Sequence, residues 1–175
     1  MSSFEESNEV CTTCEFHENL HLLREIPFFS GISLETLKVF AYLAVRETFA
    51  PGEVILRQGE DDGQALYLVS GQARLLRITE SGERIVRDYG EGDFLGGLAL
   101  MGQMHRLFSL VALTKVNCLI LHREKFSRVA EKFPDVYPKL IESIATRVRA
   151  WEAEFVSRHD HDCPQCFESI GVSLI

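Results

Sequence analysis

Residues 94–109, FLGGLALMGQMHRLFS, contain two adjacent glycines, an apolar turn and one arginine. Glycines such as Gly96 and Gly97 let backbone N–H groups approach an anion closely, and a short helix after them points its N-terminus at it. Arg106, nine residues after Gly97, is placed to pair with a phosphate. The segment predicts a phosphate-binding loop, with Leu98 and Leu107 as its apolar members. A surface or salt-bridged Arg106 is the alternative interpretation.

Four of the five cysteines form two C-x-x-C pairs, Cys11 with Cys14 and Cys163 with Cys166. In a reducing compartment such pairs serve metal or redox chemistry more often than structural disulfides. Four thiolates suit tetrahedral Zn²⁺ or an iron–sulfur cluster, provided that the fold or a dimer brings both pairs together. Reversible dithiols and incidental thiols are the alternatives. Cys118 stands alone in an apolar run, which favours a buried core cysteine over a ligand.

Composition narrows the class of protein. The chain has 175 residues and a formal net charge of −8, which disfavours direct binding to nucleic acid. We find no apolar run long enough to span a membrane and no signal peptide, so a cytoplasmic location is expected. No Ser/His/Asp or paired-carboxylate motif indicates an active site, so we do not expect an enzyme. The run Glu60–Asp62 is interpreted as a solvated turn.

Hydrophobic periodicity divides the chain into four regions: a cysteine-containing tail over 1–17, a β-roll domain over 18–133, a dimerisation helix over 134–158 and a Cys/His tail over 159–175. Helices are predicted over 18–24 and 34–43, with Ser33 as an N-cap. Between residues 45 and 122, about eight short strands separated by turn residues indicate a sandwich, jelly roll or barrel. A helix over 123–133 is predicted to end at Pro134.

The last predicted helix carries a heptad-like apolar seam. Its members follow one another at alternating steps of four and three residues: Tyr137, Ile141, Ile144, Val148, Trp151 and Phe155. Such a seam favours a homodimer, because exposed aromatic residues at the far end of a helix need a partner. Packing of the helix on its own domain is the alternative.

The order of these elements resembles the cyclic-nucleotide-binding domain of the catabolite activator/FNR regulators, also found in protein kinase A regulatory subunits and gated channels. LREIPFFSGISLETLKVFAYLA is similar to the first helices of that domain, FAPGEVILRQGEDDGQALYLVSGQARL to its central strands, and GEGDFLGGLALMGQMHR to its phosphate-binding cassette. The resemblance covers residues 22–156 and implies a mainly β fold, a double-stranded β-helix (jelly roll) with flanking helices and a long C-terminal dimerisation helix.

This sequence departs from the family pattern at functional positions. Where the family has a glutamate that holds the ribose 2′-hydroxyl, the chain has Gly97, and the usually small residues after the arginine are Leu107 and Phe108. Loss of that charge-assisted hydrogen bond costs roughly 1.5–3 kcal/mol. The FNR branch holds an iron–sulfur cluster with an N-terminal cysteine triplet and a distant cysteine. Cys11, Cys14 and Cys118 match it, but Leu20 stands at the third position.

Family transcription factors continue into a winged helix-turn-helix, for which the 20 residues after Phe155 are too few. We therefore expect a ligand- or redox-responsive sensor domain that acts on a protein partner, with a degenerate phosphate cassette and a cysteine-bound metal. A genuine cyclic-nucleotide or phosphate-ligand module, and a regulator that depends on a separate DNA-binding partner, remain as alternatives.

Overall fold

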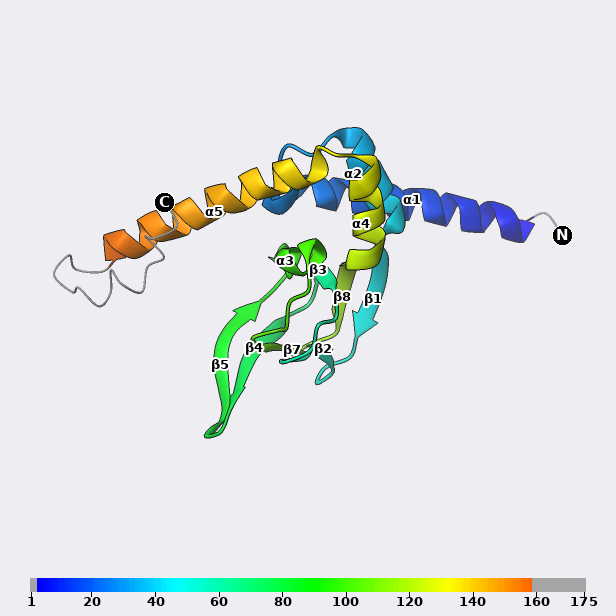
Figure 1. Cartoon of the computed structure of the whole chain (residues 1–175). Helices are drawn as coiled ribbons and strands as arrows, with labels where there is room; N and C mark the ends of the chain where they lie inside the picture. Colours follow the sequence, from blue (N-terminus) through cyan, green and yellow to red (C-terminus); the bar gives the residue numbers. More distant parts are fainter. Residues whose placement is uncertain (1–2, 159–175) are drawn as a thin grey trace.

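The computed structural model describes residues 3–158, which form a β-roll capped by helices (Figure 1). Two antiparallel sheets make up the roll, in the strand orders β1-β8-β3-β6 and β2-β7-β4-β5. The strands are β1 Val45–Phe49, β2 Val54–Leu56, β3 Gln64–Ser70, β4 Ala73–Thr79, β5 Gly82–Tyr89, β6 Phe94–Leu95, β7 Ser109–Ala112 and β8 Val116–His122. The predicted mainly β jelly roll with flanking helices is confirmed.

The first sheet is buried on both of its faces because side chains alternate along each strand. On β3, Leu66 and Leu68 face the second sheet, whereas Ala65 and Tyr67 face the helices. The helices on the outer face include the 3-10 turn η1 Pro27–Phe29, α2 Leu34–Leu43, α3 Gly97–Met101 and α4 Arg123–Lys132. A stack of Phe40 on Phe126, with ring centroids 5.0 Å apart, joins α2 to α4. The molecule therefore has three layers, which are the outer helices, the first sheet and the second sheet. The buried aromatic side chains of η1 and α2 lie between the helices and the first sheet.

The N-terminal helix is longer than the periodicity predicts. α1 spans Ser3–Glu25, so most of the predicted tail over 1–17 is helical rather than irregular. Its first turns carry no apolar stripe, which is the signal on which a helix prediction from periodicity depends. Ser33 is the N-cap of α2 as predicted, since its Oγ accepts a hydrogen bond from the Thr36 amide at 3.2 Å.

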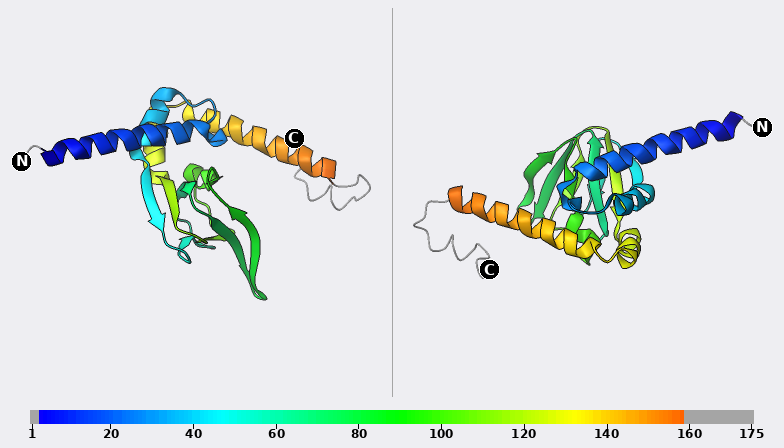
Figure 2. Two further views of the ribbon diagram at one scale, coloured as in Figure 1. Left: turned by 180° about the vertical axis from the view of Figure 1, so that it is seen from behind. Right: turned by 90° about the horizontal axis from the view of Figure 1, so that it is seen from above.

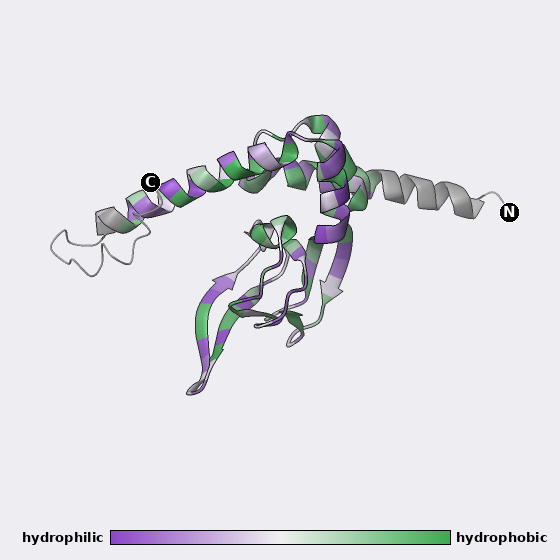
Figure 3. Cartoon of the chain, viewed as in Figure 1, coloured by the Kyte–Doolittle hydropathy of each residue, from purple (hydrophilic) through white to green (hydrophobic). Residues whose placement is uncertain are grey.

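The C-terminal helix α5, Val136–Arg158, follows Pro134 and leaves the roll on the side opposite to α1 (Figure 2). Val136 and Leu140 are fully buried, and the Ser143 hydroxyl donates to the Pro27 carbonyl at 2.8 Å. Further along, hydrophilic and hydrophobic residues alternate on the projecting part of the helix (Figure 3). Only the first turns of α5 are therefore held by the core of this chain.

The predicted seam of α5 is divided between two environments. Tyr137 and Ile144 pack partly against the core of their own chain. Ile141, Val148 and Trp151 are exposed at 58%, 43% and 54%. No helix among the described residues has the length and hydropathy to cross a membrane.

Candidate functional site

The predicted phosphate loop lies where β6 ends and α3 begins. Gly96 is the N-cap of α3 and has a φ of +81°, a left-handed conformation that favours glycine. A Cβ on Gly96 would stand 2.7 Å from the Gln64 carbonyl oxygen and 2.8 Å from Nη1 of Arg106. The glycine is therefore required here by the close approach of the arginine, and the structure brings Gly96 and Arg106 together as the sequence predicts.

Arg106 is 8% exposed and forms a two-point ion pair with Asp62. Its Nε lies 2.9 Å from Asp62 Oδ2 and its Nη2 lies 2.5 Å from Oδ1, while Nη2 also donates to the carbonyl of Gln64. Backbone hydrogen bonds join the two loops, from the Arg106 amide to the Glu60 carbonyl and from the Gly59 amide to the Arg106 carbonyl. The salt-bridged alternative for Arg106 thus describes this structure.

The neighbouring residue Asp61 forms a second ion pair, with Arg123 at the start of α4. Arg123 Nη1 donates to Asp61 Oδ2 at 3.0 Å, Nη2 donates to Oδ1, and Nε donates to the Ala99 carbonyl in α3. The hydrogen bonds from Arg123 lower the pKa of Asp61 to about 2. The interpretation of Glu60–Asp62 as a solvated turn is incomplete, because each aspartate also neutralises an arginine that is distant in sequence.

A cavity of about 410 Å³ opens beside Arg106. Its walls are mostly apolar and come from β2, β4, the end of β5, and the segment from β6 to Phe108: Leu56, Leu75, Tyr89, Phe94, Leu95, Gly96, Gly97, Leu98, Met104, His105, Arg106, Leu107 and Phe108. All five residues predicted for ligand binding line it. A pocket of this size with few polar groups has the usual character of a small-molecule site.

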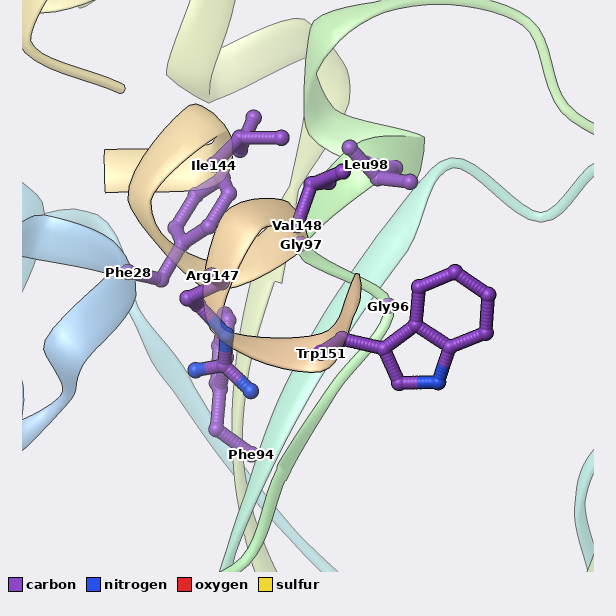
Figure 4. A pocket seen from close by; sticks show the side chains of 9 residues that line it. All are labelled: Phe28, Phe94, Gly96, Gly97, Leu98, Ile144, Arg147, Val148 and Trp151. Atoms are coloured by element: carbon purple, nitrogen blue, oxygen red, sulfur yellow. The ribbon is translucent and has the colours of Figure 1, made fainter. Parts of the chain in front are cut away.

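A second cavity, of about 390 Å³, is lined by the same segment and by α5 (Figure 4). It shares Phe94 and the stretch Gly96–Leu98 with the first cavity. Its other lining residues are Phe28 and four residues of α5: Ile144, Arg147, Val148 and Trp151. The sequence contains no local signal for this neighbourhood, because η1, β6 and α5 are far apart in the chain.

Phe28 fills the space beside Gly97, where the resemblance places the ribose-binding glutamate. A Cβ on Gly97 would lie 2.9 Å from two carbons of the Phe28 ring and 3.0 Å from Cε1 of Phe94. Phe28 is 5% exposed and also packs on Phe29 and Phe94. A glutamate at residue 97 is therefore absent from the sequence and would also collide with the Phe28 ring in this structure.

The predicted metal ligands are only partly within the described residues. Cys11 and Cys14 lie three residues apart in α1, and Cys14 is exposed, whereas Cys163 and Cys166 lie outside the described residues. Among the described residues, no group of three or more His, Cys, Asp or Glu is placed to hold a metal ion. The four-thiolate site thus stays a prediction.

An FNR-type cluster does not fit this chain. Cys118 is wholly buried between the two sheets, where burial raises the pKa of its thiol to about 11 and disfavours the thiolate that iron requires. Leu20 offers no ligand at the third position of the N-terminal triplet. Cys118 is the core cysteine that its apolar context predicts.

Comparison with known proteins agrees with this architecture. The family described as "Cyclic nucleotide-binding domain" matches residues 46–133. The cyclic AMP receptor protein of Thermus thermophilus is 34% identical over 130 residues, which cover 73% of this chain and 60% of that protein. A cAMP-dependent protein kinase regulatory subunit of Hypocrea atroviridis is 35% identical over 111 residues, covering 62% of this chain and 23% of that protein.

Solved structures give the same result. A cyclic nucleotide-binding-like protein from Brucella abortus superposes with a TM-score of 0.60 at 27% identity, covering 65% of this chain and 98% of that one. The chain spans less than two thirds of the two curated relatives named above. The resemblance inferred from the cassette and the strand pattern is confirmed: this chain belongs to the cyclic nucleotide-binding domain family.

Proposed function

We propose that this chain is a non-catalytic, cytoplasmic regulatory domain that senses a small effector in the cavity beside Arg106 and transmits its binding to α5. Two relatives support a regulatory role, since one is named a receptor protein and the other a kinase regulatory subunit. Arg106 supports an acidic effector, because its guanidinium lies beside an otherwise apolar cavity and an anion could share it with Asp62. A cyclic nucleotide is the alternative effector, supported by Gly96 and Arg106 at the family positions.

One observation carries the proposal: the stretch Gly96–Leu98, together with Phe94, is the common wall of both cavities. A molecule that moves this stretch from the side of Arg106 changes the shape of the second cavity, which Val148 and Trp151 also line. Gly97 packs closely on Phe28 and Phe94, and closely packed groups transmit displacements because they do not compress. The effector cavity and the projecting helix are thereby coupled.

The output surface in this proposal is the exposed part of α5. Ile141, Val148 and Trp151 remain uncovered in the single chain, and they lie on the seam that predicts a homodimer. A second copy of α5 would cover them, and a partner protein would respond to the altered dimer. The net charge of −8 supports a protein rather than a nucleic acid as that partner.

The proposed coupling can be tested without knowing the effector, because Trp151 is the single tryptophan of the chain and lines the second cavity. Leu98→Ala removes a side chain from the common wall, whereas Leu75→Ala removes one from the first cavity alone. We expect Leu98→Ala to shift the fluorescence emission of Trp151 and to change dimer affinity, and Leu75→Ala to change neither. Identical spectra and association for both variants and the wild type would contradict the proposal.

A metal or redox response through the cysteines is a second candidate. It is supported by the C-x-x-C spacing of Cys11 and Cys14, which is typical of thiolate metal sites. We expect zinc or iron in stoichiometric amount after anaerobic purification, lost in Cys11→Ser and in Cys163→Ser but retained in Cys118→Ala. Metal-free wild-type protein with no change in thiol reactivity under oxidant would contradict this candidate.

A further inference from the structure

The cavity beside Arg106 has few groups that could recognise a nucleotide. Its polar side chains are those of Tyr89, His105 and Arg106. None of its lining residues carries a carboxylate, a carboxamide or an aliphatic hydroxyl, the groups that hydrogen-bond base edges and sugar hydroxyls. The base and sugar of a nucleotide would therefore depend on Tyr89, His105 and backbone groups for hydrogen bonds, and each buried polar atom without a partner costs free energy.

The position of the sugar is also closed. Phe28 and Phe94 occupy the space into which a side chain at residue 97 would point, at 2.9 and 3.0 Å from its Cβ. Both rings belong to a packed aromatic group, with centroids 5.5 Å apart. A side chain that could accept from a ribose has no room at residue 97, and of the two rings Phe94 lines the cavity beside Arg106, where it favours an apolar ligand body.

Arg106 keeps one donor group for an anion. Asp62 and the Gln64 carbonyl engage its Nε and Nη2, whereas its Nη1 makes no hydrogen bond to the described residues. Buried side-chain nitrogens and oxygens without a partner are absent from the described residues, so Nη1 must be reached by solvent. It approaches Gly96, a lining residue of the cavity. One charged donor group beside an otherwise apolar cavity fits a ligand with a single acidic group.

We infer that the effector of this domain is an apolar acid, an aliphatic or aromatic body with one carboxylate or phosphate group, rather than a cyclic nucleotide. This inference rests on the proposed function and names the ligand class of the same cavity. The acidic group binds Nη1 of Arg106. The apolar body lies against the leucines and phenylalanines of the cavity, including Leu75 and Phe108. Burial of that body supplies the larger share of the affinity.

The test compares five probes on the full chain by isothermal titration calorimetry: octanoate, octyl phosphate, 1-octanol, cAMP and inorganic phosphate. We expect octanoate or octyl phosphate to bind at least tenfold more tightly than 1-octanol, cAMP or inorganic phosphate. The two acids distinguish a carboxylate from a phosphate as the acidic group. Tighter binding of cAMP than of either acid, or equal binding of octanol and the acids, would overturn the inference.

Two variants locate the binding. Arg106→Gln should weaken the better acid roughly tenfold to a hundredfold and leave 1-octanol unchanged, because only a charge-assisted hydrogen bond is lost. Arg74→Gln is the matched control, since Arg74 forms a similar two-point pair with Asp88 but lines neither cavity. Equal weakening in both variants would overturn the assignment to Arg106. If Arg106→Gln does not fold, the comparison of the acids with 1-octanol on the wild-type protein still tests whether the acidic group contributes to binding.

The experiments distinguish an error in the inferred ligand class from an error in the proposed function. If neither acid binds but Leu98→Ala still shifts the emission of Trp151, the apolar-acid inference is wrong and the coupling stands. If the acids bind without changing the emission of Trp151, and Leu98→Ala does not change it either, then the cavity binds acids but the proposed coupling to α5 is wrong.

Discussion

Phe28 lies against Gly97 so closely that any side chain at residue 97 would collide with its ring. The contact joins η1 to the first turn of α3, and it replaces the acidic group that the family uses to hold a sugar. A core aromatic residue has thus taken the space of a binding residue. This close packing, together with the glycine itself, is where the surroundings of residue 97 depart from the family pattern.

Gly97→Ala should destabilise the protein by about 1–3 kcal/mol, because the added methyl group overpacks the site. Urea denaturation followed by circular dichroism measures the change. Gly102→Ala is the control, since it lies at the other end of α3 with an extended backbone and nothing within 4 Å of its Cβ. Equal stability of Gly97→Ala and the wild type would contradict the prediction, because it would show that the Phe28 ring moves aside at no cost in free energy of unfolding.

Asp62→Asn should lower stability by about 3 kcal/mol, because it removes the counter-charge of a buried arginine. The same change should raise the affinity for octanoate, since the freed guanidinium needs another anion. Thermal unfolding and calorimetry measure the two effects. Glu60→Gln, which alters an exposed pair with Arg57, should stay within about 0.5 kcal/mol of the wild type. A fall in octanoate affinity for Asp62→Asn would contradict the competition between carboxylate and ligand.

The ion pair of Asp61 with Arg123 should make stability depend on acid pH. Arg123 lowers the pKa of Asp61 from its ordinary value of 3.8 to about 2 in the folded protein. The stabilisation is therefore complete above pH 4 and is lost as the pH falls toward 2. We expect the difference in Tm between wild type and Asp61→Asn to be positive at pH 7 and to vanish near pH 2. The same difference for Arg123→Gln should follow the same course; a constant difference at all pH values would refute the assignment.

Trp151→Glu should convert a homodimer into monomers, because a charge on the exposed seam of α5 opposes its burial against a second copy. Sedimentation equilibrium measures the association. Tyr42→Glu is the matched control: Tyr42 is 80% exposed and lies on α2, away from the seam. A wild type that is monomeric at all concentrations, or a dimer that survives Trp151→Glu, would contradict the proposed interface.

Most of the strands and helices could be predicted from local patterns in the sequence. Strand alternation, the turn residues between the strands and the break at Pro134 predict about eight strands and the last two helices, because each signal depends on residues close in the chain. The same approach missed the first turns of α1. Those turns carry no apolar stripe, and periodicity reports a helix only where one face is buried.

The sequence predicted which residues line the site but not which residues contact them. Spacing alone identified Gly96 and Arg106, whereas the partner of Arg106, Asp62, lies 44 residues away and looked like part of a solvated turn. The sequence by itself determined the acidic character of the chain, and its strand and turn pattern, with the resemblance to the family, predicted the β-roll and the loss of the ribose-binding acid. Tertiary structure decided that Phe28 fills the vacated space, that Asp62 neutralises the arginine and that α5 shares a wall with the cavity. Each of these depends on which distant surfaces meet, and periodicity along the chain carries no information about such long-range packing.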